Sequence, residues 1–214
     1  MNIFTDKETA DNYDAYYQTE AGKAVDKIEK NLFLTLMKPI PRGNMLEVGC
    51  GTGHWTKFFT DQLFDVTAAD SSENMLKIAE RKSINAKFLK ADAHRLPFDN
   101  KSFDAVSALT VLEFVDDRNT VFKEIYRVLK PGGWFILGAL NARSEIAKKE
   151  NRDSVFKHAD FMSPVTLDTE LRRFGELEIR SGVYYSHRFE LLDGTPEEKK
   201  AEPAFMAAVV RKEK

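Results

Sequence analysis

Cysteine is nearly absent from this chain, because Cys50 is the one cysteine among its 214 residues. An intrachain disulfide is therefore excluded, and the low cysteine content is typical of a protein of a reducing compartment. Long apolar runs are absent as well, since the longest uncharged stretch, 131–142, is too short to cross a bilayer. Charged residues occupy the N-terminal segment, so we expect no signal peptide, a cytoplasmic location and no membrane partner.

Neither sign of charge dominates, since 32 basic and 34 acidic side chains leave a net charge of −2. The sequence therefore predicts no electrostatic attraction to nucleic acid or to an anionic membrane. No internal repeat or low-complexity tract divides the chain. A chain of this length can bury a full sheet with helices on both faces, so we expect one domain over residues 1–214.

The segment 45–53 carries the most information about function. A short apolar run typical of a strand leads into Gly49, Gly51 and Gly53, and apolar residues at helical spacing follow. This unit places a nucleotide-like ligand at a helix N-terminus, where glycine permits both a positive φ and a close approach of the backbone. The G-x-G-x-G spacing is shorter than the dinucleotide fingerprint, and Glu47 stands two places before the first glycine. Both differences favour S-adenosylmethionine over NAD.

The next apolar run, 63–69, ends on Asp70, roughly 20 residues after Gly49. A carboxylate at the tip of the second strand can accept hydrogen bonds from both ribose hydroxyls of an adenosyl group. An alternative is that Asp70 caps a helix that begins near Ser71 or Ser72. The glycine turn at this spacing favours the ribose role.

Five segments, in order, resemble the class I S-adenosylmethionine-dependent methyltransferases, in the type 11 group that includes the ubiquinone and menaquinone C-methyltransferases. The resemblance extends over about residues 44–140 and rests on 46–53, 70–76, 91–98, 103–115 and 124–133. It implies in-line transfer of a methyl group from S-adenosylmethionine to a small-molecule acceptor. A non-catalytic sensor or scaffold that binds the cofactor would carry the same motifs, whereas a dehydrogenase would need the longer glycine spacing.

Alternating helix and strand patterns predict an α/β fold with a parallel sheet. The resemblance implies a Rossmann-like, seven-stranded, mostly parallel sheet of order 3-2-1-4-5-7-6, with an antiparallel last strand and helices on both faces. We expect a helical N-terminal lid over 1–38, a core over 39–214, a second variable lid over 141–163 and a connection at 193–200. Helices are predicted at about 21–36, 72–81, 121–129 and 167–174, and strands at 45–48, 63–69, 86–90, 103–109, 134–140, 177–189 and 204–210.

The resemblance also implies roles around the cofactor. Glu47 would orient the methionine ammonium, although it could instead cap nearby amides, and the Leu109 carbonyl would lie near the same ammonium. Asp92 would accept from the adenine amino group. Met75 would pack on the adenine face unless it is a plain core residue. The full predicted set is Tyr13, Glu47, Gly49, Gly51, Gly53, Asp70, Ser71, Met75, Asp92, Ala93 and Leu109.

The acceptor site is predicted from fewer signals. Tyr13 or Tyr17 would close the pocket, or else the tyrosines of 12–17 anchor the first helix to the core. A strand over 177–189 would send Tyr185 and His187 to one face. An imidazole titrates near neutrality, so His187 is the candidate general base, although a strand histidine more often has a structural role. The predicted acceptor-side residues are Tyr17, Glu113, Arg143, Tyr185 and His187.

The sequence names no catalytic residue, because methyl transfer from a sulfonium needs alignment and exclusion of water rather than a fixed triad. No metal is expected: Asp116 and Asp117 precede a strongly periodic helix and suit its N-terminal cap. The several cysteines of arsenic methyltransferases are missing, and Phe114 stands where relatives commonly carry histidine. The oligomeric state is left open.

Overall fold

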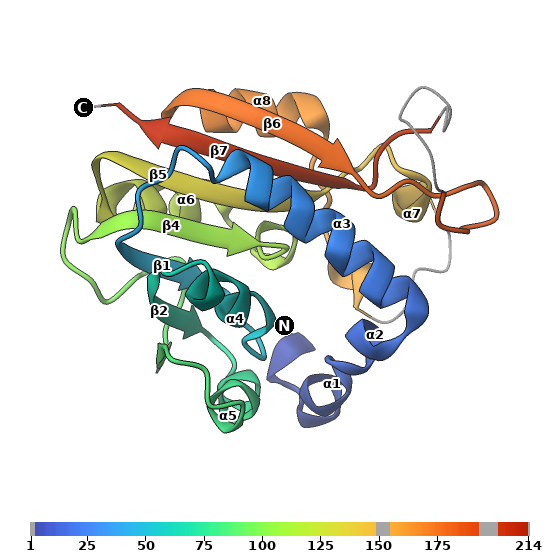
Figure 1. Cartoon of the computed structure of the whole chain (residues 1–214), viewed down its shortest axis with the longest axis horizontal. Helices are drawn as coiled ribbons and strands as arrows, with labels where there is room; N and C mark the ends of the chain where they lie inside the picture. The colour runs from blue at the N-terminus through green and yellow to red at the C-terminus, as the bar shows by residue number, and fades with distance from the viewer. Residues whose placement is uncertain (1–2, 149–154, 193–200, 214) are drawn as a thin grey trace.

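The computed structural model describes residues 3–148, 155–192 and 201–213, and its strands form one sheet of order β3-β2-β1-β4-β5-β7-β6 (Figure 1). Strands β1 to β5 are parallel, whereas β7 runs antiparallel to both β5 and β6. The predicted fold and strand order are therefore confirmed. The strands are β1 Asn44–Val48, β2 Asp65–Asp70, β3 Lys87–Lys90, β4 Phe103–Leu109, β5 Leu129–Leu140, β6 Gly175–Gly182 and β7 Phe205–Lys212.

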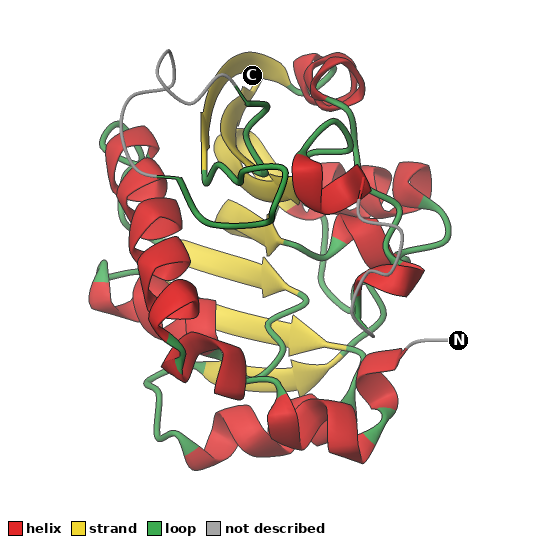
Figure 2. Ribbon diagram, turned by 90° about the vertical axis from the view of Figure 1, so that its right-hand side faces the viewer, coloured by secondary structure: helices red, strands yellow, loops and turns green. Residues whose placement is uncertain are grey.

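Helices cover both faces of this sheet (Figure 2). They are α1 Lys7–Asn12, α2 Ala15–Gln18, α3 Glu20–Leu36, α4 His54–Asp61, α5 Glu73–Arg81, α6 Arg118–Val128, α7 Glu145–Lys148 and α8 Pro164–Arg172. One face packs on α3 and α4 through buried residues such as Phe33 and Phe59, and the other packs on α6 and α8 through Ile125 and Leu167. The central strands β4 and β7 are buried along most of their length and are mostly apolar, whereas the edge strands β3 and β6 carry charged residues.

Helix starts follow the side-chain chemistry that the sequence predicts. The Ser72 hydroxyl accepts from the Met75 amide at 3.2 Å and caps α5. Asp117 accepts from the Thr120 amide at 3.1 Å and caps α6, as predicted for this position. Each cap satisfies one of the amides that a helix leaves without a partner at its first turn.

The predicted strand 177–189 is wrong in its second half. Strand β6 ends at Gly182, which pairs with Phe205, the first residue of β7. The Val183 carbonyl still accepts from the amide of Ala204, just before β7, at 2.6 Å, but the φ of 59° at Val183 turns the chain out of the strand. Tyr185 therefore lies in a loop, where it forms an isolated bridge with Leu191, and the strand alternation assumed for Tyr185 and His187 does not exist.

Other boundaries shift by a few residues. Strand β2 begins at Asp65 because Leu63 has a φ of 68°, and β5 begins before the predicted Trp134, since Leu129 already pairs with Phe103. The predicted connection at 193–200 and part of the predicted lid at 141–163 lie outside the described residues.

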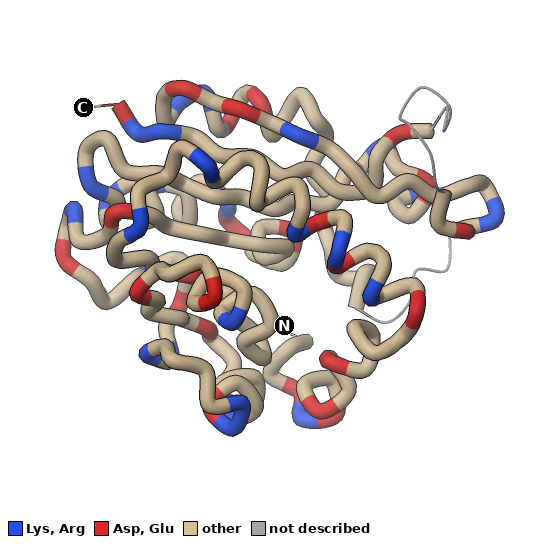
Figure 3. The backbone as a smooth tube through the Cα atoms, viewed as in Figure 1, with Lys and Arg blue, Asp and Glu red and all other residues tan. Residues whose placement is uncertain are grey.

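Charges of both signs are interspersed along the described chain (Figure 3). Many form short-range ion pairs on helix surfaces, such as Lys57 with Asp61 and Arg172 with Asp168. Within the described residues, no helix is both long enough and apolar enough to cross a membrane.

Candidate functional site

A cavity of about 420 Å³ lies where β1, β2 and β4 end. Parallel strands of an open sheet present their carboxyl ends at one edge, where ligands of this fold class bind. Nine of the predicted cofactor residues line the cavity: Tyr13, Gly49, Gly51, Asp70, Ser71, Met75, Asp92, Ala93 and Leu109. The structure thus brings together residues that are far apart in the sequence.

The glycine turn is held against the end of β2. The amides of Gly49 and Cys50 both donate to the Ala69 carbonyl, at 2.7 and 3.0 Å. Gly49 and Gly51 have φ values of 71° and 52°, which strain any side chain. A Cβ at Gly49 would lie 2.3 Å from Val111, whereas a Cβ at Gly51 would meet nothing within 4 Å. Because Gly51 lines the cavity, its missing side chain leaves room for a ligand against the backbone.

Asp70 joins the glycine turn to the start of α5. Its Oδ2 accepts from the Gly51 amide at 2.8 Å, and its Oδ1 accepts from the Ser72 amide at 2.7 Å. Burial raises the pKa of this carboxyl, and the amide hydrogen bonds oppose that rise. A carboxylate has about four acceptor sites, so these two contacts leave capacity for ribose hydroxyls. Support of the turn and ribose binding are therefore compatible roles.

The opposite wall is formed by the loop after β3. The Asp92 carboxylate accepts from the His94 amide at 2.9 Å and pairs with the His94 ring at 2.7 Å. These contacts lower the pKa of Asp92 and keep it ionised. Met75, from α5, is 1% exposed and lines the same cavity. One cavity thus offers both a carboxylate acceptor and an apolar surface, as binding of an adenine ring requires.

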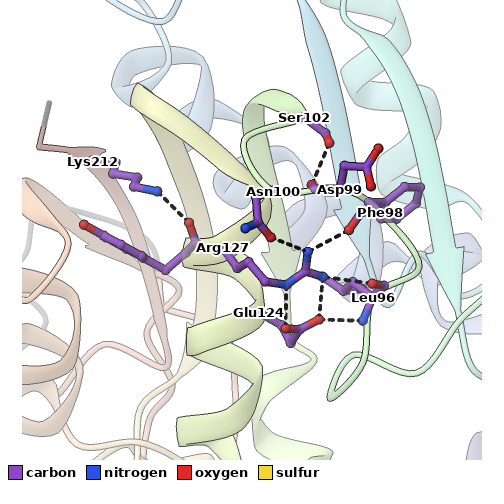
Figure 4. Close-up of polar contacts among 9 residues, drawn as sticks. Leu96, Phe98, Asp99, Asn100, Ser102, Glu124, Arg127 and Lys212 are labelled. Carbon is purple, nitrogen blue, oxygen red and sulfur yellow. Dashed lines mark hydrogen bonds and ion pairs between the residues drawn. The ribbon is translucent and has the colours of Figure 1, made fainter.

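The ion pair of Arg127 and Glu124 on α6 holds the loop after β3 through hydrogen bonds to its backbone (Figure 4). Arg127 donates to the carbonyls of Leu96 at 2.9 Å and Phe98 at 2.7 Å, and to Asn100 Oδ1 at 3.0 Å. Glu124 accepts from Arg127 Nε at 2.7 Å and from the Leu96 amide at 2.8 Å. Because Leu96 lines the cavity, this pair holds the cavity wall in place.

The end of α6 is in turn fixed by β7. Lys212 is 7% exposed, and its ammonium donates to the carbonyls of Tyr126 at 2.7 Å and Leu129 at 2.8 Å. The same ammonium lies 3.8 Å from the centre of the Tyr126 ring. These contacts satisfy carbonyl groups that the helix end would otherwise leave without donors.

Arg127→Lys should therefore weaken cofactor binding about 3- to 10-fold, because lysine keeps the charge but cannot make the forked contacts. Calorimetry with S-adenosylhomocysteine measures the affinity, and thermal unfolding measures stability. Arg172→Lys is the matched control, since its exposed pair with Asp168 lies on α8. Unchanged affinity in Arg127→Lys would show that the position of the loop does not matter for binding.

Two predicted cofactor residues do not line the cavity. Glu47 is 2% exposed and accepts from the Thr56 hydroxyl at 2.6 Å. Burial raises its pKa to about 8. Gly53 has a φ of 82° at the start of α4, and a Cβ there would lie 2.9 Å from Ile84. Gly53 therefore shapes the turn, and the ammonium role of Glu47 stays a prediction.

The N-terminal segment lies over the cavity. Tyr13 and Phe4 line it, and the Phe4 ring meets the Phe114 ring edge-on at 4.8 Å between centroids. Asp14 accepts from the Thr52 hydroxyl in the glycine turn and pairs with Lys82, both at 2.6 Å. The segment is thus attached to the cavity walls at several points.

Tyr17 lies behind Tyr13 rather than in the cavity. Its ring stacks on the His54 ring, with 3.7 Å between centroids and 8° between planes. The Tyr13 and Tyr17 rings meet edge-on at 6.3 Å. Both alternatives for these tyrosines therefore have support, since Tyr13 faces the cavity and Tyr17 packs against α4.

The other predicted acceptor residues do not line the cavity. Glu113 is 1% exposed and accepts from the Leu140 amide at 2.6 Å, while its Oε2 has no hydrogen-bond partner among the described residues. Burial raises its pKa to about 7. The His187 side chain is 94% exposed and pairs with Glu145 at 3.0 Å. Arg143 is exposed too.

Sequence reasoning missed several cavity residues. Phe4 gave no signal because a single aromatic near the N-terminus fits any packing role. Asp116 was predicted to cap a helix, but it lines the cavity while Asp117 supplies the cap. Further lining residues are Val48, Ala69, Ala91, His94, Leu96, Thr110, Val111, Phe114 and Val115. Within the described part of the chain, no group of three or more His, Cys, Asp or Glu residues is placed to hold a metal.

Relatives of this chain occur among both sequences and solved structures. Residues 46–137 match a family model described as a methyltransferase domain, of type 11. An uncharacterized protein of Methanocaldococcus jannaschii is 33% identical over 185 residues, 85% of this chain and 84% of that protein. A crystal structure from Thermotoga maritima, described as a SAM-dependent methyltransferase and possible histamine N-methyltransferase, has 26% identity and a TM-score of 0.74 over 98% of this chain and 99% of its own.

A third relative matches over a shorter region. Demethylmenaquinone methyltransferase of Lactococcus lactis is 43% identical over 98 residues. These residues are 42% of this chain and 39% of that enzyme, so the chain matches less than half the length of this relative. The residues matched by the family model, 46–137, hold the glycine turn and the adenine-side loop but not the N-terminal segment.

Proposed function

Because the chain belongs to the class I S-adenosylmethionine-dependent methyltransferases of type 11, we propose that it transfers a methyl group to a small molecule by in-line displacement. S-adenosylmethionine is its cofactor. The observation that carries the proposal is that one cavity of about 420 Å³ collects the glycine turn, Asp70, Met75 and Asp92. This volume and the mixture of apolar and polar walls suit a metabolite-sized ligand.

When bound, the cofactor supplies an activated methyl group on a sulfonium, so the protein's residues need only bind, orient and exclude water. Asp70 would hold the ribose while it supports the glycine turn. Asp92, Ala93 and Met75 would hold the adenine, and the Leu109 carbonyl would face the ammonium. In this proposal residues 1–38 form the lid of a single domain that spans 1–214.

The descriptions of the relatives name different acceptors. The Thermotoga protein is described as a possible histamine N-methyltransferase, and the Lactococcus relative methylates demethylmenaquinone, as its name states. The Thermotoga structure extends over nearly the whole of this chain, including the lid, whereas the Lactococcus match does not. Full-length similarity therefore favours a small polar acceptor.

We propose no nucleic-acid substrate, because 32 basic and 34 acidic residues offer no excess of positive charge. A cytoplasmic location, suggested by the single cysteine, is part of the same proposal.

We expect S-adenosylmethionine and S-adenosylhomocysteine to bind with micromolar affinity, roughly −7 to −9 kcal/mol, and NAD not to bind. Calorimetry with the three compounds measures this directly.

Transfer of a labelled methyl group to a metabolite panel should continue in the presence of a chelator, because the described residues hold no metal-ligand group. Activity that is lost in chelator and restored by magnesium would contradict the metal-free reading. Label in RNA or DNA would contradict the acceptor class, and tight binding with no transfer to any acceptor would indicate a sensor.

A further inference from the structure

The cavity wall after β3 contains a tight turn over residues 92–95. The Arg95 amide donates to the Asp92 carbonyl at 2.9 Å, which closes the turn. Within the turn, the His94 amide donates to Asp92 Oδ1, also at 2.9 Å. An aspartate that accepts from the amide two residues later stabilises a turn of this kind. Asp92 and His94 both line the cavity, so the turn presents two polar side chains to a ligand.

The His94 ring makes a second contact with the same carboxylate oxygen. Its Nδ1 lies 2.7 Å from Asp92 Oδ1. The lowered pKa of Asp92 keeps this carboxylate ionised, and an ionised carboxylate can only accept, so the proton of the hydrogen bond is on Nδ1. Both contacts are with Oδ1, and no donor among the described residues contacts Oδ2. Oδ2 is therefore available to a ligand.

An exposed carboxylate needs such contacts to have a fixed direction. The Asp92 side chain is 66% exposed, whereas the His94 side chain is only 32% exposed. A side chain that rotates freely must be ordered when a ligand binds, and this ordering lowers the affinity. The His94 amide and ring both restrain Oδ1, so the direction of Oδ2 is set before a ligand arrives.

The turn is itself anchored at both ends. Before it, the Ala91 amide donates at 2.9 Å to the carbonyl of the last residue of β2. After it, the carbonyl and the amide of Leu96 are bound by the ion pair on α6, at 2.9 and 2.8 Å (Figure 4). These contacts hold the backbone of the wall. The orientation of the Asp92 side chain is left to His94.

We propose that His94 is a positioning residue, which holds Asp92 so that Oδ2 accepts from the 6-amino group of the adenine and thereby sets the selectivity for a 6-amino purine. The inference rests on the proposed function, since it deepens the assignment of Asp92 to the adenine. His94 acts through Asp92 and not on the methyl group, so its effect is on affinity for the cofactor.

The test compares two ligands by calorimetry on the full chain. One is S-adenosylhomocysteine, and the other is its purine riboside analogue, in which hydrogen replaces the 6-amino group. The wild type should bind S-adenosylhomocysteine about tenfold or more tightly, because only this ligand donates from the 6-position to a carboxylate. The ratio of the two affinities reports the contact with the amino group, since the ligands are otherwise the same.

Substitutions of His94 should change this ratio and leave the affinity for the purine analogue within about twofold of the wild type. In His94→Ala and His94→Phe the ratio should fall about threefold or more, because both lose the ring N–H, although phenylalanine keeps an aromatic ring. In His94→Asn the ratio should be largely kept, since the side-chain amide offers an N–H donor at a similar distance from the backbone.

Two further variants complete the design. His158→Ala is the matched control and should bind both ligands as the wild type does, because His158 is exposed in the 3-10 helix Phe156–His158 and does not line the cavity. Asp92→Ala should lose the preference for the 6-amino group. Adding His94→Ala to it should change the ratio no further, because His94 acts only through Asp92.

The possible failures are distinguishable, and thermal unfolding reports whether each variant is folded. If S-adenosylhomocysteine does not bind to the wild type, the proposed function fails. If it binds but the wild type does not prefer it to the purine analogue, or if His94→Ala and His94→Phe keep the preference, the positioning role is wrong while the methyltransferase proposal stands. An equal loss of affinity for both ligands in His94→Ala would show that His94 only supports the turn, which also overturns the inference.

Discussion

Asp70→Ala is expected to weaken binding of S-adenosylhomocysteine about 10- to 100-fold, because two ribose hydroxyls would lose a charged acceptor. The structure adds a second cause: the Gly51 and Ser72 amides, which now donate to this carboxylate at 2.8 and 2.7 Å, would lose their acceptor too. The glycine turn would then be less firmly held against the start of α5. Calorimetry gives the affinity, and thermal unfolding reports the loss of the internal contacts.

Asp65→Ala is the matched control, since Asp65 is exposed at the opposite end of β2. It should bind the cofactor product as the wild type does. If Asp70→Ala unfolds at a lower temperature yet binds normally, Asp70 supports only the turn, and the ribose assignment is wrong. A 2′,3′-dideoxy analogue of S-adenosylhomocysteine, which lacks both ribose hydroxyls, should bind both proteins with more nearly equal affinity, which separates the ribose contacts from the turn.

The second large effect is a loss of stability as pH rises. Burial raises the pKa of Glu47 to about 8 and of Glu113 to about 7, whereas both titrate near 4.5 in the unfolded chain. Between these values the folded state holds protons that the unfolded state has released, so the free energy of unfolding falls with increasing pH. The stabilising contribution is complete below about pH 4.5 and is lost as pH rises through the folded pKa.

The titration of His54 sets the lower limit of the pH range in which the fall in stability can be assigned to the carboxyl groups. Its pKa is lowered by burial, so its protonation destabilises the fold below the ordinary histidine value of 6.5. Between about pH 6.5 and 8 the carboxyl groups dominate, and Glu47 alone should contribute a loss of about 2 kcal/mol. Denaturant unfolding at several pH values should show this slope in the wild type and a smaller one in Glu47→Gln.

Glu73→Gln provides the comparison, because that carboxyl is 61% exposed and pairs with Lys77. Its substitution should leave the slope between about pH 6.5 and 8 unchanged. An equal slope in wild type and Glu47→Gln would mean that Glu47 ionises normally in the folded protein. The hydrogen bond from Thr56 would then outweigh burial.

The cofactor side of the site could be predicted because its signals are local. Gly49 and Gly51 are fixed by a turn that begins at the end of one strand, and Asp70 ends the next. Parallel pairing of β1 with β2 then brings both strand ends to one edge. The cavity walls on this side follow from patterns that each segment carries by itself, whereas the strand order was implied by the resemblance to the methyltransferase family.

The acceptor side could not be predicted in the same way. Strand β6 stops at Gly182 because its partner β7 has no residue to pair beyond Phe205. No pattern within 183–192 indicates that β6 stops there. The sequence therefore predicted a strand geometry for Tyr185 and His187 that the structure does not have.

The position of β7 in the sheet has a consequence for folding during synthesis. Strand β7 is the last strand in the sequence, yet it lies between β5 and β6 and pairs with both along its length. While its residues are still within the ribosome, β5 and β6 have emerged and each presents an unpaired edge beside apolar surface. Phe205 and Met206, each 1% exposed in the finished fold, are the residues that cover this surface. The nascent chain is therefore most prone to aggregate, and most in need of a chaperone, just before its final strand emerges.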